Sequence, residues 1–229
     1  MSSPSPAGQA NGARPPYHQP ADGHRPYGAH RFDVYSLKAG RRLTLFGRGP
    51  LGLWVQLEAD PTVVNLCERP LVVPDSSPHR VVDFWARGQG FDRLIFLIRG
   101  DDPISRAKRE AQLAGFRIWA ADAGCTIEER PALENANGQN FWLDNWIVML
   151  QYCGSYASSL GQDYLERIGR LIDAPTSLGK LIEVAAHDGA CDDPDIVRAA
   201  IYEFVRQGRA RIPGLESARL HDGLVLEPR

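Results

Sequence analysis

The sequence predicts a mixed α/β domain followed by a smaller, mainly helical domain that ends in a β-hairpin. Short β-branched runs alternate with amphipathic segments in the first half, helical patterns dominate from about residue 163, and two β-prone runs close the chain. The chain has 229 residues, of which 43% are hydrophobic, enough for one medium domain and a small second one. We therefore expect domains at residues 32–155 and 156–229.

Residues 1–31 precede both domains and are rich in Pro, Gly, Ala and Ser, with almost no aliphatic side chains. Such a segment cannot bury enough apolar surface to offset the entropy lost on ordering. Its three histidines, His18, His24 and His30, could hold a metal, but histidines spread through a tail are usually solvated. We predict a disordered tail that acts as a tether.

The first domain is expected to begin with a helix and three strands. The helix covers residues 50–59, and the turn signal of Asp60-Pro61 ends it. Three apolar runs bounded by Pro, Gly, Asp or Ser are typical of strands. They lie at residues 65–74, 79–88 and 93–100.

A second helix and a fourth strand are expected next. Residues 102–115 are amphipathic, and Gly115 stands where a helix cap belongs. The narrow apolar face of this helix would consist of Ile104, Ala107, Ala111 and Ala114. Residues 116–123 would form the fourth strand, so the order helix, three strands, helix, strand implies a crossover connection in the sheet.

The second domain is predicted to be winged-helix-like. An aromatic segment at residues 140–156 leads to it, and core packing is the ordinary role of such a stripe. Three helical segments follow, with Thr176 or Ser177 capping the second and Asp193 the third. Helices followed by a terminal hairpin are typical of a winged helix-turn-helix.

One acidic loop of this domain could be read as a metal site. It carries His187, Cys191, Asp192, Asp193 and Asp195. The calcium-loop pattern of glycines and a terminal glutamate is missing, and acids before a helix N-terminus are favoured by the helix dipole. We favour helix capping.

Composition limits the classes of protein that are compatible with the chain. The four cysteines form no Cys-x-x-Cys pair, so neither a zinc ribbon nor a disulfide framework is indicated. No run is long and apolar enough for a membrane span or a secretory signal, so we expect a cytoplasmic protein with no membrane partner. The formal net charge of -2 provides no global basic field, so any DNA contact must come from a local patch.

The stretch from Val34 to Val73, continuing into the next two strands, resembles the TnsA family, the endonuclease subunits of heteromeric cut-and-paste transposons. The resemblance rests on the residues and their order: Ser36, Lys38 and Arg41, then Asp60-Pro61-Thr62-Val63-Val64, Glu68-Arg69-Pro70 and Asp83-Phe84. It implies a restriction-endonuclease-like core. It also implies DNA as ligand, with a transposase subunit and an AAA-type ATPase regulator as partners.

The family resemblance also implies a catalytic site built around Mg²⁺. Its carboxylates hold the ion, the ion polarises a phosphodiester oxygen, and a lysine orients or activates the attacking water. Asp83 matches the strand aspartate of that site, whereas the helix glutamate falls at Pro50 and the acid-x-lysine pair at Leu97 and Arg99. A lone carboxylate binds Mg²⁺ poorly, and Arg99 could at most contact a phosphate because its pKa is too high for a base.

The chain is therefore expected to be a pseudonuclease that acts as a DNA-binding or assembly subunit. Asp83 could equally be a strand-end carboxylate bonded to backbone amides. Two alternatives remain open: an active Mg²⁺-dependent endonuclease completed by Glu58 or Glu68, and a protein-binding adaptor that touches no DNA. Candidate DNA-binding residues lie in two basic groups. They are Arg106, Lys108 and Arg109, and Arg206, Arg209 and Arg211.

Overall fold

The chain folds into two compact units. The computed structural model describes residues 14–74, 76, 79–98, 102–133, 140–187 and 193–229, and over these residues it is a mixed α/β structure with six α-helices and three sheets. The first unit comprises Met1–Val34, Arg42–Leu53 and Thr62–Leu133. The second unit comprises Tyr35–Arg41, Trp54–Pro61 and Glu134–Arg229.

A two-stranded sheet and a helix open the described fold. The strands β1 (Arg31–Ser36) and β2 (Arg41–Phe46) pair with each other. Gly47, with φ of 98°, then turns the chain into α1 (Arg48–Ala59), and this positive φ is one that glycine adopts without strain. The helix expected at residues 50–59 is confirmed. It contributes residues to both units.

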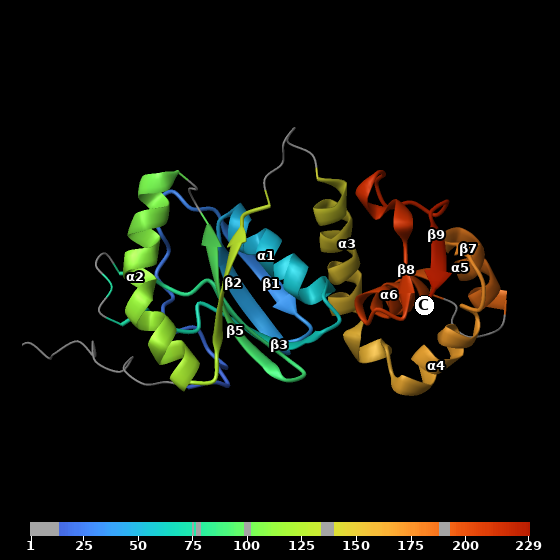
Figure 1. The fold of residues 1–229 in the computed structure, drawn as a ribbon. Helices are drawn as coiled ribbons and strands as arrows, with labels where there is room; N and C mark the ends of the chain where they lie inside the picture. The colour runs from blue at the N-terminus through green and yellow to red at the C-terminus, as the bar shows by residue number, and fades with distance from the viewer. Residues whose placement is uncertain (1–13, 75, 77–78, 99–101, 134–139, 188–192) are drawn as a thin grey trace, which may run out of the picture. The chain divides into compact units, whose positions relative to one another are not determined.

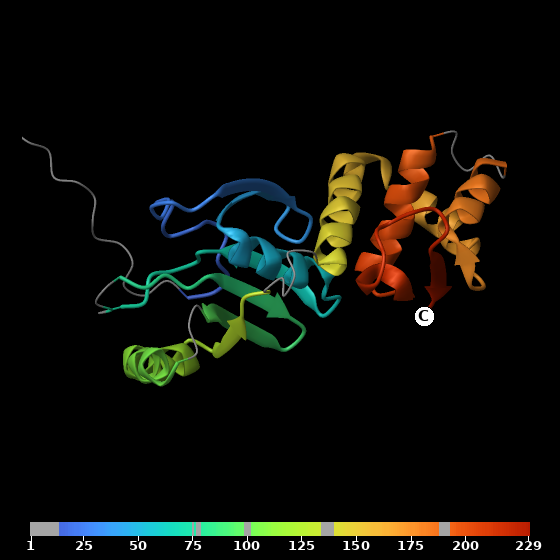
Figure 2. The ribbon, with the colours of Figure 1, turned by 90° about the horizontal axis from the view of Figure 1, so that it is seen from above.

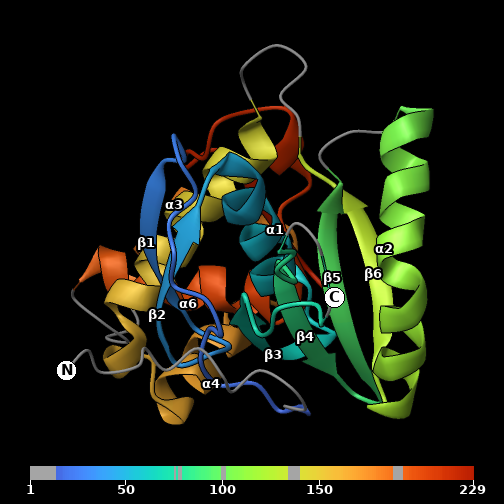
Figure 3. The ribbon, with the colours of Figure 1, turned by 90° about the vertical axis from the view of Figure 1, so that its left-hand side faces the viewer.

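The first unit is built on a four-stranded sheet in the order β3-β4-β5-β6. The strands β3, β4 and β5 are antiparallel neighbours, and β6 runs parallel to β5. The long helix α2 provides the crossover that a parallel neighbour requires, and Figure 3 shows the sheet between α1 and α2. The bounds are β3 Val63–Glu68, β4 Phe84–Gly88, β5 Phe91–Ile98, α2 Pro103–Asp122 and β6 Thr126–Pro131.

The predicted position of the fourth strand is wrong. Residues 116–123 belong almost entirely to α2, and the strand begins only at Thr126. Gly115, the expected C-terminal cap, lies inside the helix. At the start of the helix, Asp102 is the N-cap, and its side chain accepts hydrogen bonds from the backbone N–H groups of Ile104 and Ser105. Aromatic and β-branched residues made this half of the helix look like a strand, but tertiary packing overrides such weak propensities.

The core of the first unit lies between the sheet and α2. Leu113, Phe116 and Ala120 form the buried face of α2, and they pack against Trp85 and Phe96 of the sheet. Phe116 lies edge-on to Phe96, with ring centroids 6.0 Å apart. The apolar stripe predicted to begin at Ile104 is therefore not the core face of α2.

The expected disordered tail takes part in this core. Tyr17 is 5% exposed and lies edge-on to Trp85, with ring centroids 5.6 Å apart. The backbone N–H of Ala21 donates to the Arg69 carbonyl, and Arg69 pairs with Asp22. The prediction of disorder therefore does not hold from Arg14 onward, because Tyr17 packs into the core and Ala21 and Asp22 bond to Arg69. Residues 1–13 lie outside the described part.

The described part of the second unit contains the helices α3 to α6, the second half of α1 and a small sheet, and Figure 1 labels these elements. The predicted order of three helical segments and a terminal pair of strands is confirmed, as is the cap of the last helix, where Asp193 accepts from the N–H of Asp195 at 2.9 Å. The strand β9 lies between β7 and β8 and is antiparallel to both. The bounds are α3 Phe141–Ser155, α4 Gln162–Arg170, β7 Thr176–Ser177, α5 Leu178–His187, α6 Pro194–Arg206, β8 Ala210–Arg211 and β9 Val225–Pro228, with short 3-10 turns at Ala157–Ser159 and Pro213–Glu216.

Candidate functional site

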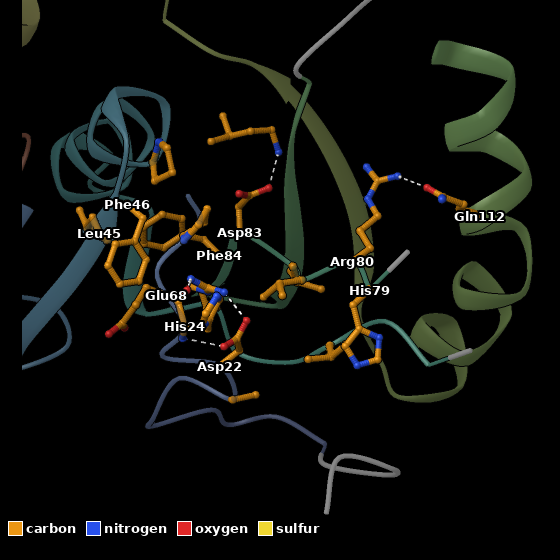
Figure 4. Close-up of a pocket in the computed structure, with 18 of the residues that line it drawn as sticks. Asp22, His24, Leu45, Phe46, Glu68, His79, Arg80, Asp83, Phe84 and Gln112 are labelled. Atoms are coloured by element: carbon orange, nitrogen blue, oxygen red, sulfur yellow. Dashed lines mark hydrogen bonds and ion pairs between the residues drawn. The ribbon is translucent and has the colours of Figure 1, made fainter. Parts of the chain in front are cut away.

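The first unit contains a pocket of about 920 Å³ close to the ends of β3 and β5 and the start of β4 (Figure 4). Its apolar wall includes Leu45, Phe46 and Pro50 from β2 and the start of α1. Its polar wall comes from one face of α2, where Ser105, Lys108, Arg109 and Gln112 follow each other at helical spacing. The pocket can therefore contact both an anionic group and an apolar one.

Asp83 lines this pocket from a position fixed by the backbone. It directly precedes β4, its N–H donates to the Ile95 carbonyl at 3.0 Å, and its carbonyl accepts from the N–H of Arg69 at 2.9 Å. Its carboxylate oxygen Oδ2 accepts from the backbone N–H of Leu97 at 2.8 Å. The carboxylate thus bridges the start of β4 and the end of β5, as the strand-end interpretation of Asp83 expects.

The other two described positions of the expected catalytic set line the same pocket. They are Pro50 and Leu97, and neither has a side-chain oxygen. Leu97 is only 6% exposed, and a Cβ placed on Gly49 would lie 3.4 Å from its Cδ1. The Leu97 side chain therefore packs against the first turn of α1. Arg99 lies outside the described residues.

Among the described positions that the resemblance assigns to a Mg²⁺ site, Asp83 alone carries a carboxylate. Asp83 contributes one carboxylate, and Asp22 forms an ion pair with Arg69. Glu68 also lines the pocket, although its side chain is buried. Among the described residues no group of three or more His, Cys, Asp or Glu side chains is arranged to hold a metal ion. A stable Mg²⁺ site needs oxygen ligands in octahedral geometry, and Pro50 and Leu97 offer none.

The basic residues predicted on α2 differ in their exposure to solvent and in their ion pairs. Arg109 is largely buried, and its Nε donates to Glu129 at 2.6 Å. Arg106 and Lys108 are exposed. The pocket also receives Arg80, whose guanidinium lies 4.6 Å from the centre of the Phe96 ring. Lys108 is exposed and lines the pocket, so it is the α2 cation best placed to meet a phosphate there, whereas Arg106 lies outside the pocket lining.

The three C-terminal arginines do not form one basic patch. Arg206 is 15% exposed and binds both carboxylate oxygens of Glu203, at 2.6 and 2.7 Å. Arg211 is exposed but pairs with Glu227 at 2.6 Å. Arg209 lies over the Phe204 ring at 4.3 Å. Carboxylates of Glu203 and Glu58 lie beside the Arg206 guanidinium, so Arg206 is held within the chain and its contact with DNA stays a prediction.

A buried charge cluster in the second unit was not predicted as a group. We call it the second-unit charge cluster, and its members are Ser36, Lys38, Glu58, Glu203 and Arg206. Ser36 donates to Oε1 of Glu58, and Nη1 of Arg206 lies 4.0 Å from Oε2 of Glu58. Lys38 donates to the carbonyls of Leu57 and Asp60 at the end of α1. The sequence singles out Ser36, Lys38, Glu58 and Arg206 for separate reasons, but no local pattern indicates that they meet.

Burial controls the ionisation of this cluster. It raises the pKa of the Glu58 carboxyl, although the hydrogen bond from Ser36 and the charges of Lys38 and Arg206 act in the opposite direction. Burial also lowers the pKa of Lys38 to about 8, against the attraction of Glu58. Among the described residues Oε2 of Glu58 has no hydrogen-bond partner. Glu58 is thus held by its own cluster and does not belong to the described lining of the Asp83 pocket.

No known family model matches this sequence, and no curated protein is detectably similar to it. No helix in the described part of the chain has the length and apolar character needed to cross a membrane.

Proposed function

We propose that the chain is a nuclease-fold subunit of a DNA transposition machinery that no longer cleaves DNA and serves as a DNA-binding or assembly component. The observation that carries this proposal is the meeting of Pro50, Asp83 and Leu97 around one pocket. The TnsA-like resemblance assigns these three positions to a catalytic site from sequence alone. They are separated by 33 and 14 residues along the chain, so their proximity in space was not guaranteed.

The sheet of the first unit supports a restriction-endonuclease-like core. The order α1, β3, β4, β5, α2, β6, with β6 parallel to β5, matches the helix, three strands, helix and strand that the sequence pattern predicts. The resemblance places the aspartate on one strand and the acid-x-lysine pair on the next strand. Asp83 has this relation to β4 and β5, through its bond to the N–H of Leu97.

Loss of cleavage follows from the chemistry of the pocket. Metal-assisted hydrolysis needs a divalent ion to polarise the phosphodiester and generate the nucleophile. Two of the positions that would hold the ion are a proline and a leucine, and the leucine is packed against α1. What remains on the α2 side of the pocket is the exposed cation Lys108, which can attract a DNA phosphate without metal.

The second unit supports a winged-helix-like domain. Its last three helices, α4, α5 and α6, are followed by the antiparallel strands β8 and β9, and β7 pairs with β9 at its other edge. This is the arrangement of a helical module with a β-wing. The proposed partners, a transposase subunit and an AAA-type ATPase regulator, follow from the family resemblance.

The DNA-binding part of the proposal can be tested by fluorescence anisotropy with a short duplex in EDTA. We expect the affinity for DNA to fall steeply as the salt concentration rises. In the double variant Arg106→Gln/Lys108→Gln, the slope of log affinity against log salt concentration should become less steep by about one for each phosphate that is no longer neutralised. The control is Arg170→Gln/Lys180→Gln, which removes the same charge from exposed positions of the second unit. Absence of salt-dependent binding would contradict the DNA role and favour a protein-binding adaptor.

One observation keeps an active endonuclease as a second candidate. Glu68 lines the same pocket as Asp83 and could supply a displaced oxygen ligand. Glu68→Gln should leave Mn²⁺ binding and DNA affinity unchanged if the pocket is vestigial. A metal affinity lost in both Glu68→Gln and Asp83→Asn would support the endonuclease instead.

A further inference from the structure

The outer face of α2 carries an exposed apolar seam. Ile104 and Ile118 are 81% and 75% exposed, among the most exposed large hydrophobic side chains of the described residues. Four exposed alanines continue the seam, so that its members recur at alternating intervals of three and four residues: Ile104, Ala107, Ala111, Ala114, Ile118 and Ala121. Leu113, Phe116 and Ala120 form the opposite, buried face. In Figure 2 α2, coloured light green, is seen nearly end-on beside the sheet, with its other side free of the sheet.

This spacing is the one with which α-helices pair. Apolar residues that alternate at three and four form a narrow seam, which faces a partner helix in a coiled-coil pair. Single exposed hydrophobic residues are normal on protein surfaces, but six in register along one helix are not explained by the packing of the first unit. The seam therefore fits a second helix better than it fits solvent.

The sequence of the seam is complementary to itself in the antiparallel direction. When two copies of α2 cross at the point between Ala111 and Ala114, Ile104 of one copy faces Ala121 of the other. Ala107 then faces Ile118 of the second copy, and each large side chain meets a small one, as close packing requires. A parallel pair would instead oppose isoleucine to isoleucine and alanine to alanine. It would alternate crowded and empty layers.

The charges beside the seam are complementary in the same arrangement. Glu110 and Arg117 lie along one edge, and Arg117 donates to Glu110 within the same helix. In the antiparallel pair Glu110 of each copy lies opposite Arg117 of the other, so two-fold symmetry produces two favourable contacts. In this arrangement Glu110 does not face Glu110 of the other copy, and Arg117 does not face Arg117.

We propose that the outer face of α2 is the interface of a symmetric antiparallel dimer of this chain. Such an interface is isologous, because the same patch of both copies closes on itself and leaves no free binding face. This proposal rests on α2 alone and does not depend on the proposed function.

Sedimentation equilibrium of the full chain over a concentration series tests the dimer. The wild type should show a monomer–dimer equilibrium, and Ile118→Asp should raise the dimer dissociation constant about 100-fold or more, because each dimer loses two buried isoleucines. The control Val184→Asp changes an exposed hydrophobic residue of α5 and should leave the equilibrium unchanged. Circular dichroism should show that both variants remain folded, since both positions are exposed. A wild type that stays monomeric up to about 100 µM, or an unaffected Ile118→Asp dimer, would overturn the proposal and leave the seam to a different partner.

Cross-linking and charge reversal test the geometry. In a Cys191→Ser background, an Ile104→Cys chain mixed with an Ala121→Cys chain should form a disulfide between the two variants. Cross-linking of Ile104→Cys with itself would instead indicate a parallel pair and contradict the proposed arrangement. Glu110→Arg alone should weaken the dimer at low salt, and Glu110→Arg/Arg117→Glu should restore it. A double variant as weak as the single one would contradict the charge pairing.

Discussion

Removing the guanidinium of Arg206 should destabilise the second unit by about 3–5 kcal/mol, because a charged partner is lost from a buried ion pair. The Arg206 side chain is 15% exposed and binds Glu203 through two hydrogen bonds, at 2.6 and 2.7 Å. It also lies 4.0 Å from the fully buried Glu58. Arg206→Ala therefore leaves two buried carboxylates with Lys38 as the remaining cation of the second-unit charge cluster. Arg209→Ala removes an exposed guanidinium and should cost less than about 1 kcal/mol.

Hydrogen exchange followed by mass spectrometry can measure this difference in each unit separately. Amides of α6 should exchange about 100-fold faster or more in Arg206→Ala, while those of α2 serve as the internal reference from the first unit. Peptides from Arg209→Ala should exchange at nearly the wild-type rate. Unchanged exchange of α6 in Arg206→Ala, together with weaker DNA binding, would refute the buried ion pair and show that Arg206 is a surface contact.

Three further predictions concern other buried groups. Because the pKa of Lys38 is lowered to about 8, the folded chain binds fewer protons than the unfolded chain between that pH and about 10.5. The free energy of unfolding should thus rise with pH across that window by up to about 3 kcal/mol relative to Lys38→Met, and parallel urea-denaturation profiles would contradict this. Tyr17→Ala should destabilise the first unit by about 3 kcal/mol in urea denaturation, because it opens a cavity beside Trp85; an unchanged midpoint would show that the segment is dispensable. Burial raises the pKa of the Cys125 thiol to about 11, so iodoacetamide should leave it unmodified at pH 8 in the native chain, and rapid labelling would contradict its burial.

The sheet of the first unit was largely predictable from sequence, whereas α2 was only half predictable. Short β-branched runs bounded by turn residues identified the segments of β3, β4 and β5. This is possible because the residues that favour a strand, and the turn residues at its ends, are all local in sequence. The second half of α2 contains Phe116, Ile118 and Trp119, which favour strands in isolation. Its helical state depends on Phe116 reaching the sheet together with Leu113, a long-range contact that local patterns do not contain.

The family resemblance assigned Pro50 and Leu97 to the same site as Asp83, and all three line one pocket. That this pocket is a former nuclease site stays a prediction. The hydrogen bond from the Leu97 amide and the contact of Leu97 with α1 depend on three-dimensional packing, which the sequence does not reveal. Similarly, the partner of Arg206 could not be identified from charge alone. An arginine at a helix end is exposed in most folds, and here buried carboxylates hold it.

Calorimetric titration of the full chain with Mg²⁺ and Mn²⁺ in the presence of a short DNA duplex tests the vestigial pocket most directly. Wild type and Asp83→Ala should give the same weak, non-stoichiometric heats, because one carboxylate does not make a divalent-ion site. Stoichiometric binding by the wild type that disappears in Asp83→Ala would contradict the loss of the metal site and show that the pocket still holds a catalytic ion.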